Sequence, residues 1–160
     1  MKEKVYISGR AINCPLGEDL DEVIASVRNK EVKVEDLPLT LAGLPYTRPY
    51  YRIRRERGTD AEKLFFSVLF ETTAKAFADA GLTDSEIRNM SIFFGSTSID
   101  IPIYESYYEK SDSNGAVYFS QASLGYGSII ADVARHFDIR GGCYTFTTAC
   151  TSSANGLLYA

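Results

Sequence analysis

Apolar and polar positions alternate along the chain in patterns that predict strands and helices by turns. The apolar run 5–7 (Val-Tyr-Ile) has the pattern of a short buried strand, and 13–17 reads as the loop that leaves it. Asp19 with Glu22 three residues later forms a capping pair for a helix from about 19 to 29. The apolar positions of that helix follow the i, i+3, i+4, i+7 spacing: Leu20, Val23, Ile24 and Val27.

The next part of the chain changes character. Residues 31–58 are predicted to be irregular, because their prolines exclude a long helix: Pro38, Pro45 and Pro49. A long helix follows, beginning at the capping box Thr59-x-x-Glu62 and ending at Gly81.

The second half repeats the alternation. Another capping box, Thr83-x-x-Glu86, starts a brief helical turn before the apolar strand 91–94. A tyrosine- and serine-rich connection at 99–127, too long for a passive loop, leads to a helix around 129–137 and a strand at 143–147. Strands that alternate with helices predict an α/β layer with parallel strands and right-handed crossovers.

Composition narrows the class of protein. The chain has 160 residues and a net charge of −4, which gives no whole-chain case for binding nucleic acid or an anionic membrane. No segment has the length of a secretory signal core or a membrane span. Three cysteines, Cys14, Cys143 and Cys150, form neither an even disulfide framework nor a C-x-x-C metal pair, so we expect a reduced, cytoplasmic protein without metal.

The stretch 142–156 holds the strongest chemical signal. A β-type alternation runs into small residues around Cys150 and then into a helix, which is how a chain presents a nucleophile on a sharp strand-to-helix turn. A helix N-terminus favours a thiolate, and the Cys150 N–H could donate to an oxyanion. A buried cysteine acting as a small hydrophobe explains a lone cysteine equally well, and spacing alone does not decide between them.

The residues next to Cys150 in the sequence resemble those of a known protein family. Thr148-Ala149-Cys150-Thr151-Ser152-Ser153 resembles the active-site signature of the β-ketoacyl-acyl carrier protein synthases, members of the thiolase-like superfamily. Other segments resemble the same family in the same order: 5–9 with 13–17, Asp79-Ala80-Gly81-Leu82, Gly95-Ser96 and 137–142. The resemblance implies a thiolase-like layered α/β fold, a mixed and mainly parallel sheet with flanking helices. It also implies that 1–160 is an incomplete N-terminal half, truncated within the helix after the nucleophile.

The resemblance further implies a reaction. Cys150 would accept an acyl group from a carrier-protein thioester, and the carbanion left by decarboxylation of malonyl-carrier protein would attack it. No cofactor is implied beyond the phosphopantetheine of the acyl carrier protein, and the product is a fatty acid or polyketide, aryl polyenes included. The two histidines of the family's second half-reaction come from its C-terminal half, so the 160-residue chain alone is expected to be inactive. The one histidine here, His136, is interpreted as structural or solvent-facing rather than as a base for Cys150.

Further site residues follow from the same resemblance. Arg54, Arg55 and Arg57 lie where the family docks its acidic carrier protein, although a solvated charged loop explains them equally well. Ser98 and Phe119 are expected in the acyl tunnel. Nearby tyrosines fit a tunnel wall, dimer contacts or an ordinary interface: Tyr104, Tyr107, Tyr108 and Tyr118. Strand 143–147 resembles the family's dimer strand, which predicts a homodimer or a ketosynthase-type heterodimer.

Two other functions stay open at this point. A non-catalytic partner subunit that sets chain length is one, but such subunits usually lack the cysteine. Another thiolase-like acyltransferase is the second, although its elbow motif would differ from Thr-Ala-Cys-Thr-Ser-Ser.

Overall fold

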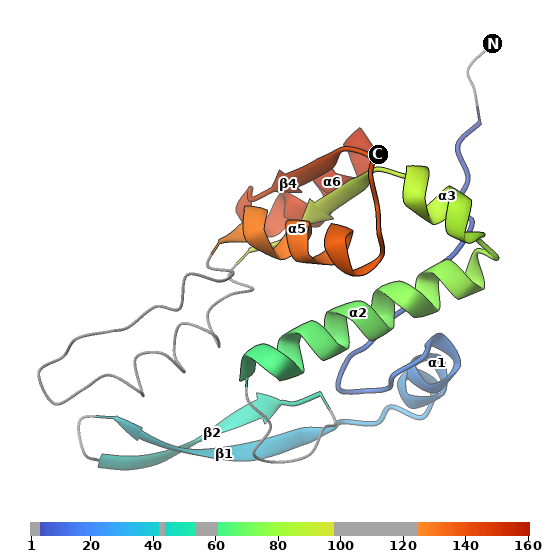
Figure 1. Cartoon of the computed structure of the whole chain (residues 1–160). Helices are drawn as coiled ribbons and strands as arrows, with labels where there is room; N and C mark the ends of the chain where they lie inside the picture. Colours follow the sequence, from blue (N-terminus) through green and yellow to red (C-terminus); the bar gives the residue numbers. More distant parts are fainter. Residues whose placement is uncertain (1–3, 42–43, 54–60, 98–124) are drawn as a thin grey trace, which may run out of the picture. The chain divides into compact units, whose positions relative to one another are not determined.

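The structure is a computed structural model of the chain, and it describes residues 4–41, 44–53, 61–97 and 125–160. Figure 1 shows the elements in chain order, coloured from blue to red. Their bounds are α1 Leu20–Arg28, β1 Val34–Leu41, β2 Leu44–Tyr51, α2 Ala61–Asp79, α3 Asp84–Asn89, β3 Ile92–Gly95, α5 Tyr126–His136, β4 Cys143–Phe146, the 3₁₀ turn η1 Ala149–Thr151 and α6 Ser152–Tyr159.

The chain divides into two compact units. The first comprises residues 1–59 with 71–80, and the second comprises 60–70 with 81–160. Helix α2 therefore gives its first part to the second unit and its last part to the first.

Helix α1 of the first unit begins where the sequence predicts. The Asp19 carboxylate accepts a hydrogen bond from the Glu22 N–H at 2.9 Å, and the Glu22 carboxylate accepts one from the Glu18 N–H at 2.9 Å. On this helix Ser26 is buried, at 3% exposure, because its hydroxyl donates to the Leu16 carbonyl at 3.0 Å.

The region predicted to be irregular contains a β-hairpin, so that prediction was wrong. Strands β1 and β2 pair antiparallel, from Val34 opposite Tyr51 to Leu41 opposite Leu44. Three prolines lie within these strands: Pro38, Pro45 and Pro49. A two-stranded ladder consists of two edge strands, so a residue without an N–H can face the open side. The prolines exclude a helix but not this sheet.

The predicted strand at 5–7 is also absent. Val5, Tyr6 and Ile7 are 92%, 76% and 78% exposed and belong to no sheet of the described residues. An extended segment becomes a strand only when a partner supplies the ladder hydrogen bonds, and neither described sheet reaches it. Just beyond, the Arg10 N–H donates to the Asp79 carboxylate at 2.9 Å, which ties the N-terminal segment to the end of α2 within the first unit.

The second unit is built on the parallel pair β3 and β4, which confirms the predicted parallel pairing. Ile92 lies opposite Cys143, and Gly95 lies opposite Phe146. Helices α5 and α6 both pack on this pair. The buried apolar side chains come from α5 and the turn after it: Ile129, Ile130, Val133 and Ile139. The described sheets are separate and each is of one kind, β1 with β2 antiparallel and β3 with β4 parallel, so no single mixed sheet is seen among the described residues.

Local signals in this part of the chain are confirmed as well. Thr83 and Glu86 form the predicted capping box at α3, each side chain meeting the other's backbone N–H. The Glu86 pKa lies below its usual value because its carboxylate accepts hydrogen bonds from Thr83. The bond from the Thr83 backbone has the larger effect and the bond from its side chain the smaller. Gly81 ends α2 with a φ of +65°, a left-handed conformation that glycine adopts at little cost.

The turn after α5 is held by an ion pair with two arginines. The Asp138 carboxylate accepts from Arg88 Nε at 2.8 Å and from Arg140 Nη2 at 3.2 Å. The hydrogen bond from Arg140, followed by that from Arg88, lowers the Asp138 pKa below its usual 3.8. This contact links the α3 segment to the approach to β4.

Replacing Asp138 with Asn should therefore give a pH-dependent loss of stability. Asp138 has a φ of +52°, which asparagine also tolerates, so the change removes charge without adding backbone strain. A lowered carboxyl pKa stabilises the folded chain above the unfolded value and ceases to do so as the pH falls through the folded one. Thermal unfolding of the full-length protein should show D138N less stable than wild type at pH 7, with the gap closing below about pH 4. A gap independent of pH would contradict this.

Candidate active site

The end of β4 leads directly into the turn that carries Cys150. The strand ends at Phe146, two residues outside any strand or helix follow, and the 3₁₀ turn Ala149–Thr151 passes into α6 at Ser152. Cys150 lies in the middle of this turn and is exposed to solvent. The predicted strand-to-helix turn is confirmed, and its cysteine is accessible rather than buried.

The turn is strained at the residue before the cysteine. Ala149 has a φ of +51°, in the left-handed region that a residue with a Cβ rarely adopts. Such a conformation costs about 1–3 kcal/mol and persists only where the surroundings impose it. Strand-to-helix turns that expose a nucleophile have this kind of sharp, strained backbone.

Ser152 supplies much of that constraint. Its side chain is 2% exposed, and its Oγ accepts from the Thr148 N–H at 2.9 Å and donates to the Ala149 carbonyl at 2.7 Å. One buried hydroxyl therefore holds the peptide groups on both sides of the strained position. Because this buried hydroxyl both donates and accepts a hydrogen bond, the cost of removing it from water is offset.

Small residues let α6 approach the end of β3. A Cβ added to Gly95 would lie 2.3 Å from the Ser152 carbonyl oxygen, which no side chain can occupy. The Ser153 hydroxyl donates to the Gly95 carbonyl at 3.2 Å, and Gly156 is buried one turn later. The expectation that this turn needs small residues is met by Ser152 and Ser153.

At the start of α6, the Thr151 N–H donates to the Thr148 carbonyl and the Ser152 N–H donates to the Ala149 carbonyl. The N-cap residue of α6 is Thr151, yet no side chain among the described residues makes a capping hydrogen bond there. The Thr151 hydroxyl instead donates to the Thr148 carbonyl at 2.8 Å. The helix dipole favours negative charge at a helix N-terminus. A thiolate or an oxyanion is the kind of group that such a dipole stabilises.

Comparison with known proteins agrees with this geometry. Residues 2–160 match the family described as β-ketoacyl synthase, N-terminal domain. The chain belongs to this family. Its fold class is therefore the thiolase-like α/β fold, and its chemistry is of the ketosynthase type, that of acyl-transferring condensing enzymes. The resemblance seen around Cys150 is confirmed. No curated protein matches the chain.

Several predicted site residues of this β-ketoacyl synthase domain lie outside the described residues: Arg54, Arg55, Arg57, Ser98, Phe119 and the tyrosines 104, 107, 108 and 118. Two arginines of the same basic stretch are described. Arg48 lies over the Tyr46 ring at 5.5 Å, a cation–π contact, and Arg52 follows the hairpin.

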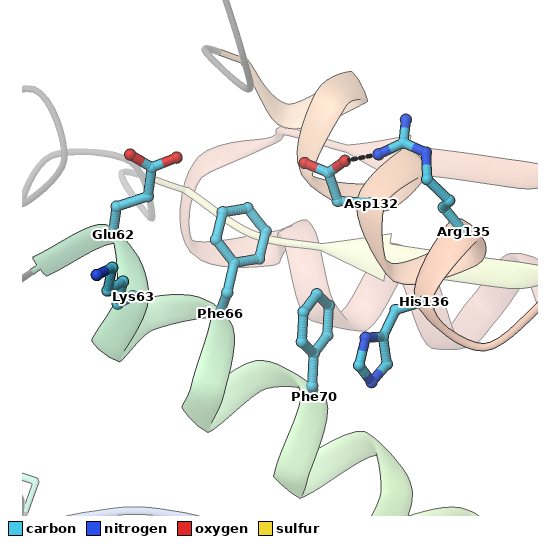
Figure 2. Close-up of a pocket in the computed structure, with 7 residues that line it drawn as sticks. All are labelled: Glu62, Lys63, Phe66, Phe70, Asp132, Arg135 and His136. Atoms are coloured by element: carbon cyan, nitrogen blue, oxygen red, sulfur yellow. Dashed lines mark hydrogen bonds and ion pairs between the residues drawn. The ribbon is translucent and has the colours of Figure 1, made fainter. Parts of the chain in front are cut away.

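His136 belongs to an aromatic cluster and not to the cysteine turn. The centroids of its ring and the Phe70 ring are 3.9 Å apart with an interplanar angle of 8°, and the centroids of its ring and the Phe137 ring are 4.7 Å apart and nearly perpendicular. Both are packing contacts, and the residue as a whole is exposed. Figure 2 shows Phe70 and His136 in a cavity of about 690 Å³ within the second unit. The described residues that line it are Glu62, Lys63, Phe66, Phe70, Asp132, Arg135 and His136.

This cavity was not predicted, although its pattern is present in the sequence as Phe66 with Phe70 and Asp132 with His136, each four residues apart on a helix. Arg135 is paired with Asp132 (Figure 2), and the rings pack on one another. Among the described residues, no group of three or more histidine, cysteine or acidic side chains could hold a metal ion. No described helix is long and apolar enough to cross a membrane.

Adding a methyl group at Gly95 should disrupt the site. Gly95→Ala places a Cβ into the Ser152 backbone, so we expect the free energy of unfolding to fall by about 2–3 kcal/mol in chemical denaturation of the full-length protein. Gly127→Ala is the matched control, because a Cβ there meets nothing within 4 Å. The control should stay within about 1 kcal/mol of wild type. Equal effects of the two changes would contradict the close approach of α6 to β3.

Proposed function

We propose that the protein is a β-ketoacyl-acyl carrier protein synthase in which Cys150 accepts the acyl group. The observation that supports this most directly is the exposed position of Cys150 on a strained turn between β4 and α6. A structural cysteine would need neither exposure nor strain. An attacking sulfur needs an open approach and a fixed position.

The first half-reaction uses the groups around the turn. The Cys150 thiolate attacks the thioester carbonyl of an acyl group carried on the phosphopantetheine of an acyl carrier protein. A tetrahedral intermediate forms, with the Cys150 N–H as one donor to its oxyanion. The intermediate collapses with release of the phosphopantetheine thiolate, and the acyl group stays on Cys150 as a thioester. No cofactor takes part in this step.

The second half-reaction forms the carbon–carbon bond. Malonyl-carrier protein loses carbon dioxide, and the resulting carbanion attacks the acyl-Cys150 carbonyl. The Cys150 thiolate leaves, and the product is a β-ketoacyl thioester two carbons longer than the acyl group. Fatty acids or polyketides, aryl polyenes included, are the products in view, and Ser98 and Phe119 are proposed to line the acyl tunnel.

The proposed partners follow from charge and from the strand arrangement. Arg54, Arg55 and Arg57 are proposed to attract the acidic acyl carrier protein, because they form a basic cluster on a chain whose overall net charge is −4. A homodimer or a ketosynthase-type heterodimer is proposed through β4. Tyr144 on that strand is 51% exposed, and among the described residues β4 pairs only with β3.

The acyl acceptor can be tested by mass spectrometry. The full-length protein incubated with an acyl-carrier-protein thioester should gain one acyl group per chain, on the peptide that contains Cys150. Cys150→Ser should abolish the adduct, because a neutral hydroxyl is a far weaker nucleophile than a thiolate. Cys143→Ser is the control and should leave the adduct unchanged. An unmodified Cys150 would instead favour a non-catalytic partner subunit, and transfer from a different acyl donor would favour another thiolase-like acyltransferase.

Carrier-protein docking can be tested by reversing charge. Arg54→Glu with Arg55→Glu should raise the KM for the carrier-bound substrate about tenfold at low ionic strength and less in high salt, with kcat little changed. Lys4→Glu with Arg28→Glu changes the net charge equally, at two exposed positions elsewhere in the chain, and serves as the control. A KM that does not respond, or that responds equally in both variants, would argue against a docking site at these arginines.

A further inference from the structure

A side-chain hydrogen bond spans the cysteine turn. Asn155 Nδ2, in the second turn of α6, donates to Thr148 Oγ1 at 2.7 Å, and Cys150 lies between the two in sequence. The Thr151 hydroxyl lies 2.8 Å from the Thr148 carbonyl oxygen and 3.1 Å from Thr148 Oγ1. With its N–H bonded to Ser152, every polar group of Thr148 has a partner.

Neither helix capping nor stability explains this concentration of hydrogen bonds. Asn155 and Thr151 direct their side chains at Thr148 and leave the first turn of α6 without a side-chain cap from the described residues. Thr148 and Thr151 are exposed, and hydrogen bonds in contact with water contribute little net stability. Their main effect is therefore on geometry.

The geometry concerned is that of the nucleophile. Ala149 has a φ of +51°, a conformation that persists only where the surroundings impose it, and Cys150 is the next residue. Ser152 restrains the backbone at 148 and 149. Asn155 fixes the Thr148 side chain to α6 and so closes a second, separate link across the turn.

We propose that Thr148 and Asn155 are positioning residues for Cys150, acting through the hydrogen bond between their side chains. This rests on the proposed function of Cys150 as acyl acceptor. Neither residue is assigned contact with the substrate. Together they restrain the backbone that carries Cys150 through one side-chain hydrogen bond, and rates of reactions at a nucleophile depend steeply on its placement.

The test uses variants that remove the bond with little change of shape. Thr148→Val and Asn155→Ala each break it, Thr148→Ser retains the hydroxyl, and Thr147→Val makes the same chemical change at a neighbouring exposed residue. For each full-length protein, the rate of Cys150 alkylation by iodoacetamide is followed against pH at the peptide level, beside kcat, KM and the thermal unfolding midpoint.

T148V and N155A should each lower kcat about tenfold with KM unchanged, and should change the rate of Cys150 alkylation relative to wild type at the same pH. T148S and T147V should behave as wild type. The double variant T148V/N155A should be no worse than the worse single variant, because each single change already removes the Thr148–Asn155 hydrogen bond.

Other outcomes would overturn the proposal. One is a rate of Cys150 alkylation that equals the wild-type rate at every pH while only the unfolding midpoint falls. Another is a double variant whose losses multiply. Alkylation requires no acyl transfer, so it decides the positioning role even if the wild-type protein takes no acyl group. A wild-type protein that alkylates normally but is never acylated would instead reject the proposed function of Cys150.

Discussion

The start of helix α6 lies against the end of strand β3 at Gly95, where the space for a side chain is filled by the Ser152 backbone. This approach sets the position of α6, and the turn that joins β4 to α6 must be correspondingly short. A short turn between a strand and a helix leaves few backbone conformations, and here one residue, Ala149, takes a positive φ. Cys150 is exposed because it occupies the apex of that turn.

Hydroxyl and amide side chains around the turn are used in an unusual way. Residues such as Thr151 at a helix start ordinarily accept from the helix's own N–H groups. Here Thr151, Ser152 and Asn155 all bond to the chain before the helix, at Thr148 or Ala149. These bonds hold the turn, and they leave the start of α6 without a side-chain cap from the described residues.

Much of the second unit could be predicted from the sequence, because its signals are local. The Thr83–Glu86 capping box, the glycine stop at Gly81 and the strand-to-helix turn at Cys150 depend on residues a few positions apart. The family could be identified from the residues around Cys150 for the same reason. The prediction of a strand at 5–7 was wrong because a strand requires a hydrogen-bonded neighbour, and apolar periodicity does not show whether one is present.

The hairpin was missed for a related reason. Prolines predict a break in regular structure. Whether the position without an N–H can face the open edge of a sheet depends on the register between β1 and β2. In the site, the Thr148–Asn155 bond joins residues seven apart across a change from strand to helix, so no single period displays it. The clash at Gly95 involves residues more than fifty positions apart and needs the folded chain.

Cys150 on this turn is proposed to be the acyl acceptor. The most direct test is to mix the full-length protein with acyl-carrier-protein thioester, without malonyl-carrier protein, and to measure released carrier thiol over time. We expect a rapid burst of about one thiol per chain followed by little further release, because the acyl group stays on the enzyme. No burst, or a burst of the same size from Cys150→Ala, would contradict the account.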